Sequence, residues 1–312
     1  MSHVNTDCRW GVICHSQTGA SHLRNKLPNQ DAIGHYIAPD GSPPVVLAVA
    51  DGHGSPKSFR SDVGAQFAVE TAVEVCRKFL DGMQGADFSA VKNAAKQGLP
   101  AEIVREWQRQ VKEHVAGKPF TEDELARLAE QAGAAASERA ARPEQHYVAY
   151  GTTILVAILT NEFLICFQLG DGDILAAYDA TDEVGRVIAR DEALIANETT
   201  SLCQDDAARQ FRFEFRVIQH SLPGLVFLST DGYANSFVSP DAFLKVGRDY
   251  LDMLRTEGAE EVKNNLPAWL EETSSNGSGD DITVGIIYRR EPPLGKPAVV
   301  EQEPPESQGT LS

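Results

Sequence analysis

Short strand patterns occur in two blocks of the sequence with a long helical block between them, and this order constrains the fold more than any other feature. The expected strands are 11–15, 32–37 and 45–50 in the first block, and 151–159, 162–169, 174–178, 211–217, 225–230 and 282–288 in the second. Residues 45–50 are almost wholly apolar, which is typical of a strand covered on both faces. Because strands and helices come in blocks, the sequence predicts an α+β protein with antiparallel sheets and helices packed outside them.

Helical patterns fill most of the remaining sequence. The predicted helices cover 57–80, most of 81–146 with breaks at 82–85, 98–100 and 117–119, and then 240–255 and 259–273. The stretch 81–146 is interpreted as a solvated helical elaboration, with a docking insert as the alternative. Residues 291–312 contain five prolines and a charge of 1 − 4 = −3. We therefore expect one folded domain over residues 1–290 and a disordered tail over 291–312.

The charge of the chain excludes some classes of partner. There are 28 Lys and Arg against 45 Asp and Glu, a net charge of −17. This excess of acid argues against non-specific nucleic-acid binding and against a polybasic membrane anchor. The apolar runs fall far short of the ~20 residues that a membrane span needs. Five cysteines without a C-x-x-C pair, together with a polar start at residues 1–9, predict a cytoplasmic protein with free thiols.

Aspartates stand at the ends of several predicted core strands. Asp51 directly follows strand 45–50, and Asp231 directly follows strand 225–230. The other aspartates beside strands are Asp31, Asp171, Asp173, Asp280 and Asp281. A single Asp-Gly is more often only a turn. Carboxylates gathered at one sheet edge, however, repel by about 4 kcal/mol per pair at ~4 Å. Divalent cations would offset this repulsion, and oxygen ligands alone favour Mg²⁺ or Mn²⁺ over structural zinc.

Six short motifs, most of which contain these aspartates, follow one another along the chain. They are Asn29-Gln30-Asp31, Asp51-Gly52-His53-Gly54, Gly151-Thr152-Thr153, Leu169-Gly170-Asp171-Gly172-Asp173, Ser229-Thr230-Asp231-Gly232 and Gly279-Asp280-Asp281-Ile282-Thr283. The series resembles the type-2C metal-dependent Ser/Thr protein phosphatase family, particularly its bacterial members, over roughly residues 9–290. The resemblance implies an α/β/β/α sandwich, in which two antiparallel sheets carry helices on both outer faces and a two-metal centre at one edge.

The resemblance also implies a role for each aspartate. Asp51 would bridge both metals, with the Gly52 carbonyl as a further ligand, and Asp231 and Asp280 would complete one site. Asp31 would act through bound water. Two further positions complete the expected set: Asp171, which with Asp231 would hold a third metal, and Asp281, which stands where the family usually has Asn and would support the ligands. The polar segment 181–209 falls where the family inserts a flap beside the site.

Two positions depart from the family pattern. Gln30 replaces a common Glu, so it can orient water but adds no charge to the second metal site. Lys26 occupies the position of the usual phosphate-binding Arg, and it lacks the guanidinium fork. His22 or Arg24 could take over the phosphate-binding role.

The chemistry implied by the motifs is the hydrolysis of phosphoserine and phosphothreonine in proteins. Two metals would lower the pKa of a shared water and clamp the phosphoryl oxygens. His53 is the candidate general acid for the leaving alkoxide, and its alternative role is a turn histidine capping the helix near Lys57. We expect a monomeric enzyme that acts on phosphorylated proteins, with a cognate Ser/Thr kinase as a further partner.

Two other functions stay open at this point. The first is a non-catalytic phosphoprotein-binding module of the same fold, whose mark would be loss of Asp51, Asp231 or Asp280. The second is a phosphomonoesterase for small molecules. Most of the remaining acidic residues are expected to form a solubilising surface that would disfavour highly acidic phosphopeptides.

Overall fold

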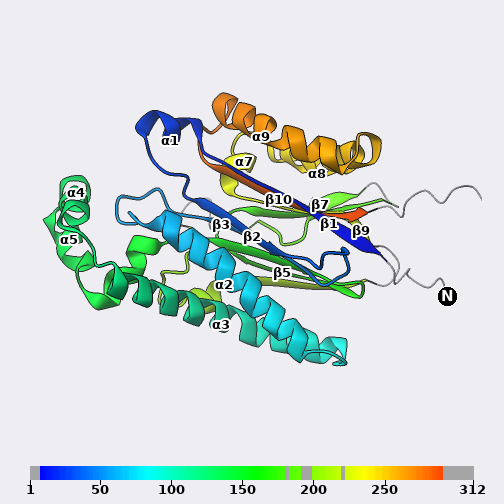
Figure 1. Ribbon diagram of the computed structural model, residues 1–312, viewed down its shortest axis with the longest axis horizontal. Helices are drawn as coiled ribbons and strands as arrows, with labels where there is room; N and C mark the ends of the chain where they lie inside the picture. Colours follow the sequence, from blue (N-terminus) through cyan, green and yellow to red (C-terminus); the bar gives the residue numbers. More distant parts are fainter. Residues whose placement is uncertain (1–7, 180–182, 191–198, 219–221, 291–312) are drawn as a thin grey trace, which may run out of the picture.

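Two five-stranded antiparallel sheets stack face to face, and helices cover the outer face of each (Figure 1). The computed structural model describes residues 8–179, 183–190, 199–218 and 222–290. The strands are β1 Arg9–Gln17, β2 Asp31–Tyr36, β3 Val45–Asp51, β4 Ile154–Leu159, β5 Phe163–Leu169, β6 Asp173–Tyr178, β7 Val184–Arg186, β8 Arg212–Val217, β9 Pro223–Ser229 and β10 Ile282–Arg290. The first sheet has the order β1-β10-β9-β6-β7 and the second has the order β2-β3-β4-β5-β8.

Strand β3 shows why the apolar strands lie between layers. Val46, Ala48 and Ala50 point into the core beneath the helices of the second sheet. Their neighbours Leu47 and Val49 point into the core between the two sheets. A third core lies between the first sheet and its own helices. The predicted burial of 45–50 on both faces is therefore confirmed, as is the α/β/β/α arrangement.

Helices form the two outer layers. Their bounds are α1 Ala20–Asn25, α2 Ser61–Gly82, α3 Phe88–Gly117, α4 Glu122–Ala132, α5 Ala134–Ala140, the 3-10 helix η1 Pro143–Tyr150, α6 Ala207–Gln210, α7 Asp231–Ala234, α8 Pro240–Thr256 and α9 Ala259–Asn276. Helices α2 and α3 contribute to the core above the second sheet, while α8 and α9 contribute to the core above the first (Figure 1).

The helical stretch 81–146 is integrated into the fold rather than appended to it. Val91, Ile103 and Trp107 of α3 are buried in the core above the second sheet. Arg60, just before α2, donates hydrogen bonds of 2.7 and 2.9 Å to Glu124 of α4. These contacts give the stretch a structural role, and a docking role for it stays a prediction.

Three sequence expectations need correction. The break predicted at 98–100 is wrong, because α3 continues through Pro100. Pro100 removes one backbone donor, but Leu99 and Pro100 are both buried, and their packing outweighs that loss. The helix predicted from Lys57 begins at Ser61. The short elements α1 and β7 were not expected, because each is too short to produce a periodic pattern.

Other expectations fall partly or wholly outside the described residues. The tail 291–312 lies outside them, as do 181–182 and 191–198 of the flap-like segment. All five cysteines are free thiols, as expected. In the described ranges, no helix combines the length and apolar character that crossing a membrane requires.

Gly64 of α2 gives a test of helix packing. A methyl group there would overlap the Tyr150 carbonyl, and the Gly64 carbonyl accepts a 3.0 Å hydrogen bond from the Trp107 indole. We predict that Gly64→Ala lowers the free energy of unfolding by about 1–3 kcal/mol, although Ala favours helix. Gly98→Ala is the matched control, because nothing lies within 4 Å of the added methyl; it should raise stability by about 0.5–1 kcal/mol. Urea unfolding of both variants measures the difference, and equal effects would contradict the packing argument.

Candidate active site

The register of β2 and β3 places two aspartates opposite each other. Asp31 and Asp51 are direct partners in this antiparallel ladder. Like charges directly opposite one another in a sheet are destabilising, so this pair needs compensation. Thr230 supplies part of it by donating a 2.8 Å hydrogen bond from Oγ1 to Asp31 Oδ2. This role of Thr230 was not predicted from the sequence.

The Gly151-Thr152-Thr153 motif holds the backbone of Asp51. The N–H of Thr153 and the hydroxyl of Thr152 donate to the Asp51 carbonyl, at 2.8 and 2.9 Å. The N–H of Asp51 donates in turn to Thr153 Oγ1 at 3.0 Å. The motif therefore positions the end of β3, a role that the sequence pattern did not reveal.

Asp231 and Asp171 come from the adjacent ends of β9 and β6. Asp231 opens α7 two residues after the end of β9, and Asn235 one turn later donates a 2.9 Å hydrogen bond to its carboxylate. Asp171 is close enough for its charge to raise the pKa of Asp231. Asp173, two residues further on, is only 2% exposed and forms ion pairs with Arg186 and Arg190. These two ion pairs give Asp173 a structural role.

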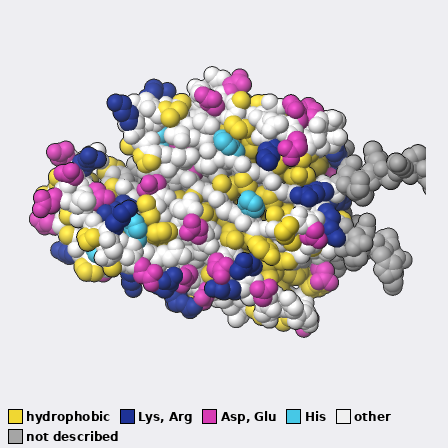
Figure 2. Space-filling view, in the orientation of Figure 1, with side chains coloured by type: hydrophobic (Ala, Val, Ile, Leu, Met, Phe, Trp, Pro, Cys, Tyr) yellow, Lys and Arg dark blue, Asp and Glu magenta, His cyan; other side chains and the backbone are white. Residues whose placement is uncertain are grey.

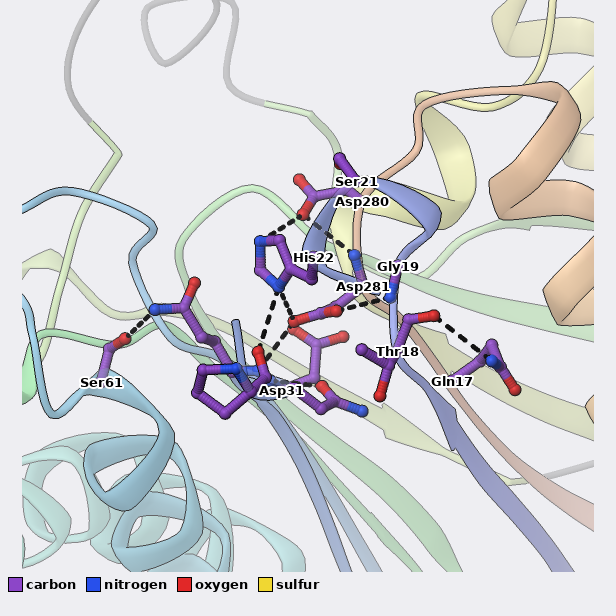
Figure 3. Close-up of polar contacts among 12 residues, drawn as sticks. Gln17, Thr18, Gly19, Ser21, His22, Asp31, Ser61, Asp280 and Asp281 are labelled. Carbon is purple, nitrogen blue, oxygen red and sulfur yellow. Dashed lines mark hydrogen bonds and ion pairs between the residues drawn. The ribbon is translucent and has the colours of Figure 1, made fainter. Parts of the chain in front are cut away.

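Asp281 joins the end of the chain to two segments near its start (Figure 3). Its Oδ1 accepts the Gly19 N–H at 2.7 Å, and its Oδ2 accepts the Gln30 N–H at 2.7 Å. His22 Nδ1 lies 2.8 Å from the same Oδ2 and 3.2 Å from the Pro28 carbonyl. Since both neighbours of Nδ1 are acceptors, Nδ1 carries the hydrogen. The expected role of Asp281 in supporting the metal ligands stays a prediction.

We call Asp31, Asp51, Asp171, Asp231, Asp280 and Asp281 the carboxylate cluster. Burial is the largest cause that raises the pKa values of Asp31, Asp51 and Asp231. The charges of Asp31, Asp231 and Asp280 further raise that of Asp51. Burial and the charges of Asp171 and Asp280 likewise raise the pKa of Asp231. The folded protein thus gathers more negative charge than it neutralises by itself.

The cluster fits divalent cations in its donor chemistry, because carboxylate and carbonyl oxygens are the ligands that Mg²⁺ and Mn²⁺ prefer. Across the described ranges, however, no three His, Cys, Asp or Glu side chains already enclose one point as ligands of a single ion. One of these oxygens, Asp31 Oδ2, accepts the hydrogen bond of Thr230. The observation that favours bound cations is therefore the negative charge of the carboxylate cluster, which no Lys or Arg side chain among the described residues is seen to neutralise.

His53 follows the β3 end and lies beside Gly151. Its N–H donates a 3.0 Å hydrogen bond to the Gly151 carbonyl, and its ring atom Cδ2 would lie 2.7 Å from a methyl group on Gly151. The N-cap position of helix α2 is Arg60, and the alternative role of His53 as a turn histidine capping the helix stays a prediction. The role of His53 as a general acid stays a prediction.

The three phosphate-binding candidates occupy different positions on α1 and its end. His22 Nε2 lies 3.8 Å from Asp280, against the cluster (Figure 3). Arg24 and Lys26 are exposed, and in the described part of the chain neither forms an ion pair or hydrogen bond with a carboxylate. His22 is therefore the candidate that touches the cluster.

Gln30 bridges the cluster to the helix layer. Its side-chain amide donates a 2.9 Å hydrogen bond to Ser61 Oγ, at the start of α2 (Figure 3). Its carbonyl accepts the Gly52 N–H at 3.0 Å. Gln30 thus connects β2, the turn after β3 and α2 without adding a charge.

The fold and the site together define a metal-dependent protein phosphatase of the 2C class. A family model described as "Protein phosphatase 2C" matches residues 18–271. The chain therefore belongs to the protein phosphatase 2C family. A search of curated proteins found no match.

Solved structures of bacterial phosphatases share this fold. The Ser/Thr phosphatase Stp1 from Staphylococcus aureus matches with a TM-score of 0.53 and 14% identity, over 94% of this chain and 98% of that chain. The Ser/Thr phosphatase from S. agalactiae matches with a TM-score of 0.53 and 16% identity, over 89% and 99%. The catalytic domain of PstP, in complex with two manganese ions, matches with a TM-score of 0.53 and 16% identity, over 91% and 100%.

The raised pKa values predict an unusual pH dependence for the metal-free protein. A carboxyl whose pKa is higher in the folded state stabilises the fold most at pH below its unfolded pKa. That stability is lost as pH rises through the folded pKa. Since the pKa values of Asp31, Asp51 and Asp231 are raised, metal-free protein should become less stable as pH rises out of the ordinary carboxyl range. Thermal unfolding in EDTA across pH measures this loss.

Two variants make this test specific. Asp51→Asn removes one repelling charge, so it should flatten the pH dependence and raise the metal-free melting temperature. Mn²⁺ at ~100 times its Kd should stabilise the wild type by about 2.7 kcal/mol and should stabilise Asp51→Asn much less. Glu130→Gln, at an exposed position of α4, is the control and should behave like the wild type. A metal-free wild type that gains stability with rising pH would contradict the argument.

Proposed function

We propose that this chain hydrolyses phosphoserine and phosphothreonine in proteins, with two Mn²⁺ or Mg²⁺ ions held by the carboxylate cluster. The observation that supports this most is the convergence of carboxylates from separated segments, whose charges act on Asp51 and Asp231. The two manganese ions of the related PstP catalytic domain support the choice of cation. The proposed ligands are Asp31 through water, Asp51, the Gly52 carbonyl, Asp231, Asp280, and Asp171 for a third ion.

Around those ions, different residues of this chain would position the ligands, contact the phosphate and protonate the leaving group. When bound, the two cations supply an acidified water and neutralise charge on the phosphoryl group. The hydrogen bonds of Thr152 and Thr153 hold the Asp51 backbone in place, and the Asp51 carboxylate would help to hold both ions. We assign phosphate contact to His22, because it lies against Asp280 and Asp281. His53 is proposed to protonate the leaving alkoxide.

The first test is metal-dependent activity. Purified protein with Mn²⁺ should hydrolyse both p-nitrophenyl phosphate and a phosphothreonine peptide. EDTA and Asp51→Asn should each abolish this activity, because both remove the bridged cations. Glu130→Gln, whose carboxylate lies outside the cluster, should retain full activity. Wild-type rates in both EDTA and Asp51→Asn would overturn the two-metal proposal.

His53 can be tested by varying the leaving group. A serine or threonine alkoxide needs a proton on departure, whereas p-nitrophenolate is a good leaving group by itself. His53→Ala should therefore slow the phosphothreonine peptide by about 10²–10⁴-fold and slow p-nitrophenyl phosphate much less. Equal losses on both substrates would argue against a general acid.

The same assays separate the alternatives. A non-catalytic module is not favoured, because Asp51, Asp231 and Asp280 are all retained; it would bind phosphoproteins without releasing phosphate. A small-molecule phosphomonoesterase would prefer small esters to phosphopeptides. We further propose a monomeric, cytoplasmic signalling enzyme that opposes a Ser/Thr kinase; the five free thiols support the cytoplasmic assignment.

A further inference from the structure

Helix α1 is held against the carboxylate cluster by groups from the far end of the chain. The Gly19 N–H donates to Asp281, and the Ser21 N–H donates a 2.8 Å hydrogen bond to the Gly279 carbonyl. A methyl group on Gly19 would lie 2.6 Å from the Asp280 carbonyl oxygen, so the backbones of the two segments pack too closely for any side chain at this position. His22 completes the attachment through Asp281. The helix is therefore fixed beside Asp280, at the rim of the site (Figure 3).

The outer side of α1 and its end present two apolar and two cationic side chains to solvent. Leu23 and Leu27 are 58% and 48% exposed, and they are among the few large apolar side chains so exposed in the described part of the chain. Arg24 and Lys26 are exposed between them. We call these four residues the α1 surface. Figure 2 shows Lys and Arg side chains beside apolar ones at the upper left, where Figure 1 places α1.

The charge of this surface is opposite to that of the whole protein. No acidic residue occurs between Arg9 and Gln30, although the chain carries a net charge of −17. Among the described residues, Arg24 and Lys26 form no ion pair that would neutralise them within the molecule. An acidic partner could therefore pair with both cations without displacing an existing contact.

The backbone at the end of α1 also favours an exposed role for Lys26. Its N–H donates to the Leu23 carbonyl, and the Leu27 N–H donates to the His22 carbonyl, the two bonds of a Schellman cap. Lys26 adopts the left-handed conformation with φ 56°, where glycine is preferred. The left-handed conformation costs a lysine more backbone free energy than a glycine, and the side chain of Lys26 is exposed to solvent there.

We propose that the α1 surface docks the substrate segment next to the phosphorylated residue, and that it selects segments carrying apolar and acidic side chains. This inference rests on the proposed phosphatase function. The two leucines would cover an apolar side chain of the substrate, while Arg24 and Lys26 would pair with its carboxylates. The position beside Asp280 gives the reason for this occupant, because a phosphoprotein that presents its phosphate to the cluster must run past the rim.

The test compares three phosphothreonine peptides of equal length. The first has Leu and Glu flanking the phosphothreonine, the second has Ser and Gln, and the third has Leu and Lys. The full-length chain with Mn²⁺ should give the first peptide a kcat/KM about tenfold higher than the second, mainly through KM. The third peptide should be the poorest of the three. The preference for Glu should shrink at high salt, because exposed charge pairs are screened.

Five variants, two of them controls, test whether this preference resides on α1. Leu23→Ser with Leu27→Ser should remove the preference for Leu, and Arg24→Gln with Lys26→Gln should remove the preference for Glu. Val238→Ser, at a side chain 99% exposed, and Lys96→Gln, exposed on α3, are the matched controls and should preserve both preferences. Hydrolysis of p-nitrophenyl phosphate, which is too small to reach the two leucines, should be similar to that of the wild type in the Leu23→Ser, Leu27→Ser variant and in both controls. Lys26→Gly should reduce the preference for Glu without lowering the melting temperature, which separates docking from stability.

Each outcome decides the proposal. Loss of the preferences in the α1 variants alone supports it. Equal kcat/KM for all three peptides, or a preference that survives in the α1 variants, overturns docking while leaving the phosphatase proposal intact. Failure to hydrolyse any peptide would instead overturn the phosphatase proposal. A dimer in solution that dissociates in the Leu23→Ser, Leu27→Ser variant would assign the α1 surface to a second copy of this chain and overturn substrate docking.

Discussion

Repulsion between carboxylates at one edge of the two sheets is the constraint on which the rest of this site depends. Asp31 and Asp51 face each other across the β2–β3 ladder, and Asp231 and Asp280 act on the same group of charges. Folding brings these charges together because the strands that carry them bury apolar side chains in the cores on both faces of the sheet. The edge therefore stores unfavourable electrostatic energy that a pair of divalent cations can release, which couples metal binding to stability.

The groups around the carboxylates are arranged to hold them rather than to neutralise them. Thr152 and Thr153 bind the backbone of Asp51, and Thr230 binds the side chain of Asp31. These donors are hydroxyls and amides, and Gln30 likewise contributes no charge. Strong neutralisation by Arg or Lys would compete with cations for the same oxygens. The neutral donors maintain the geometry and leave the charge for the metals.

Asp281 is the exception, and it shows how the cluster is connected to the outer surface. It is 3% exposed and accepts hydrogen bonds from Gly19, Gln30 and His22. Through these contacts, the start of β10 fixes α1, and α1 carries the exposed residues Leu23 and Lys26. The chemistry at the cluster and the surface proposed to select substrates are thus connected through one buried carboxylate.

The sequence by itself determined the fold class, the two-sided burial of strands such as 45–50 and the aspartates at the strand ends. Those features follow from local apolar periodicity and from motif order, which a linear pattern can carry. It wrongly predicted a break at 98–100, because the buried packing of Leu99 and Pro100 is not visible in a linear pattern. It missed α1, because a helix of six residues produces no periodic pattern. Only the tertiary structure decided that Asp31 stands opposite Asp51, that Asp173 is occupied by Arg186 and Arg190, and that His22 rather than Lys26 touches the cluster. The physical reason is that strand register and side-chain pairing between distant segments, such as Arg9 and Arg290 in the β1–β10 ladder, are set only when the layers pack.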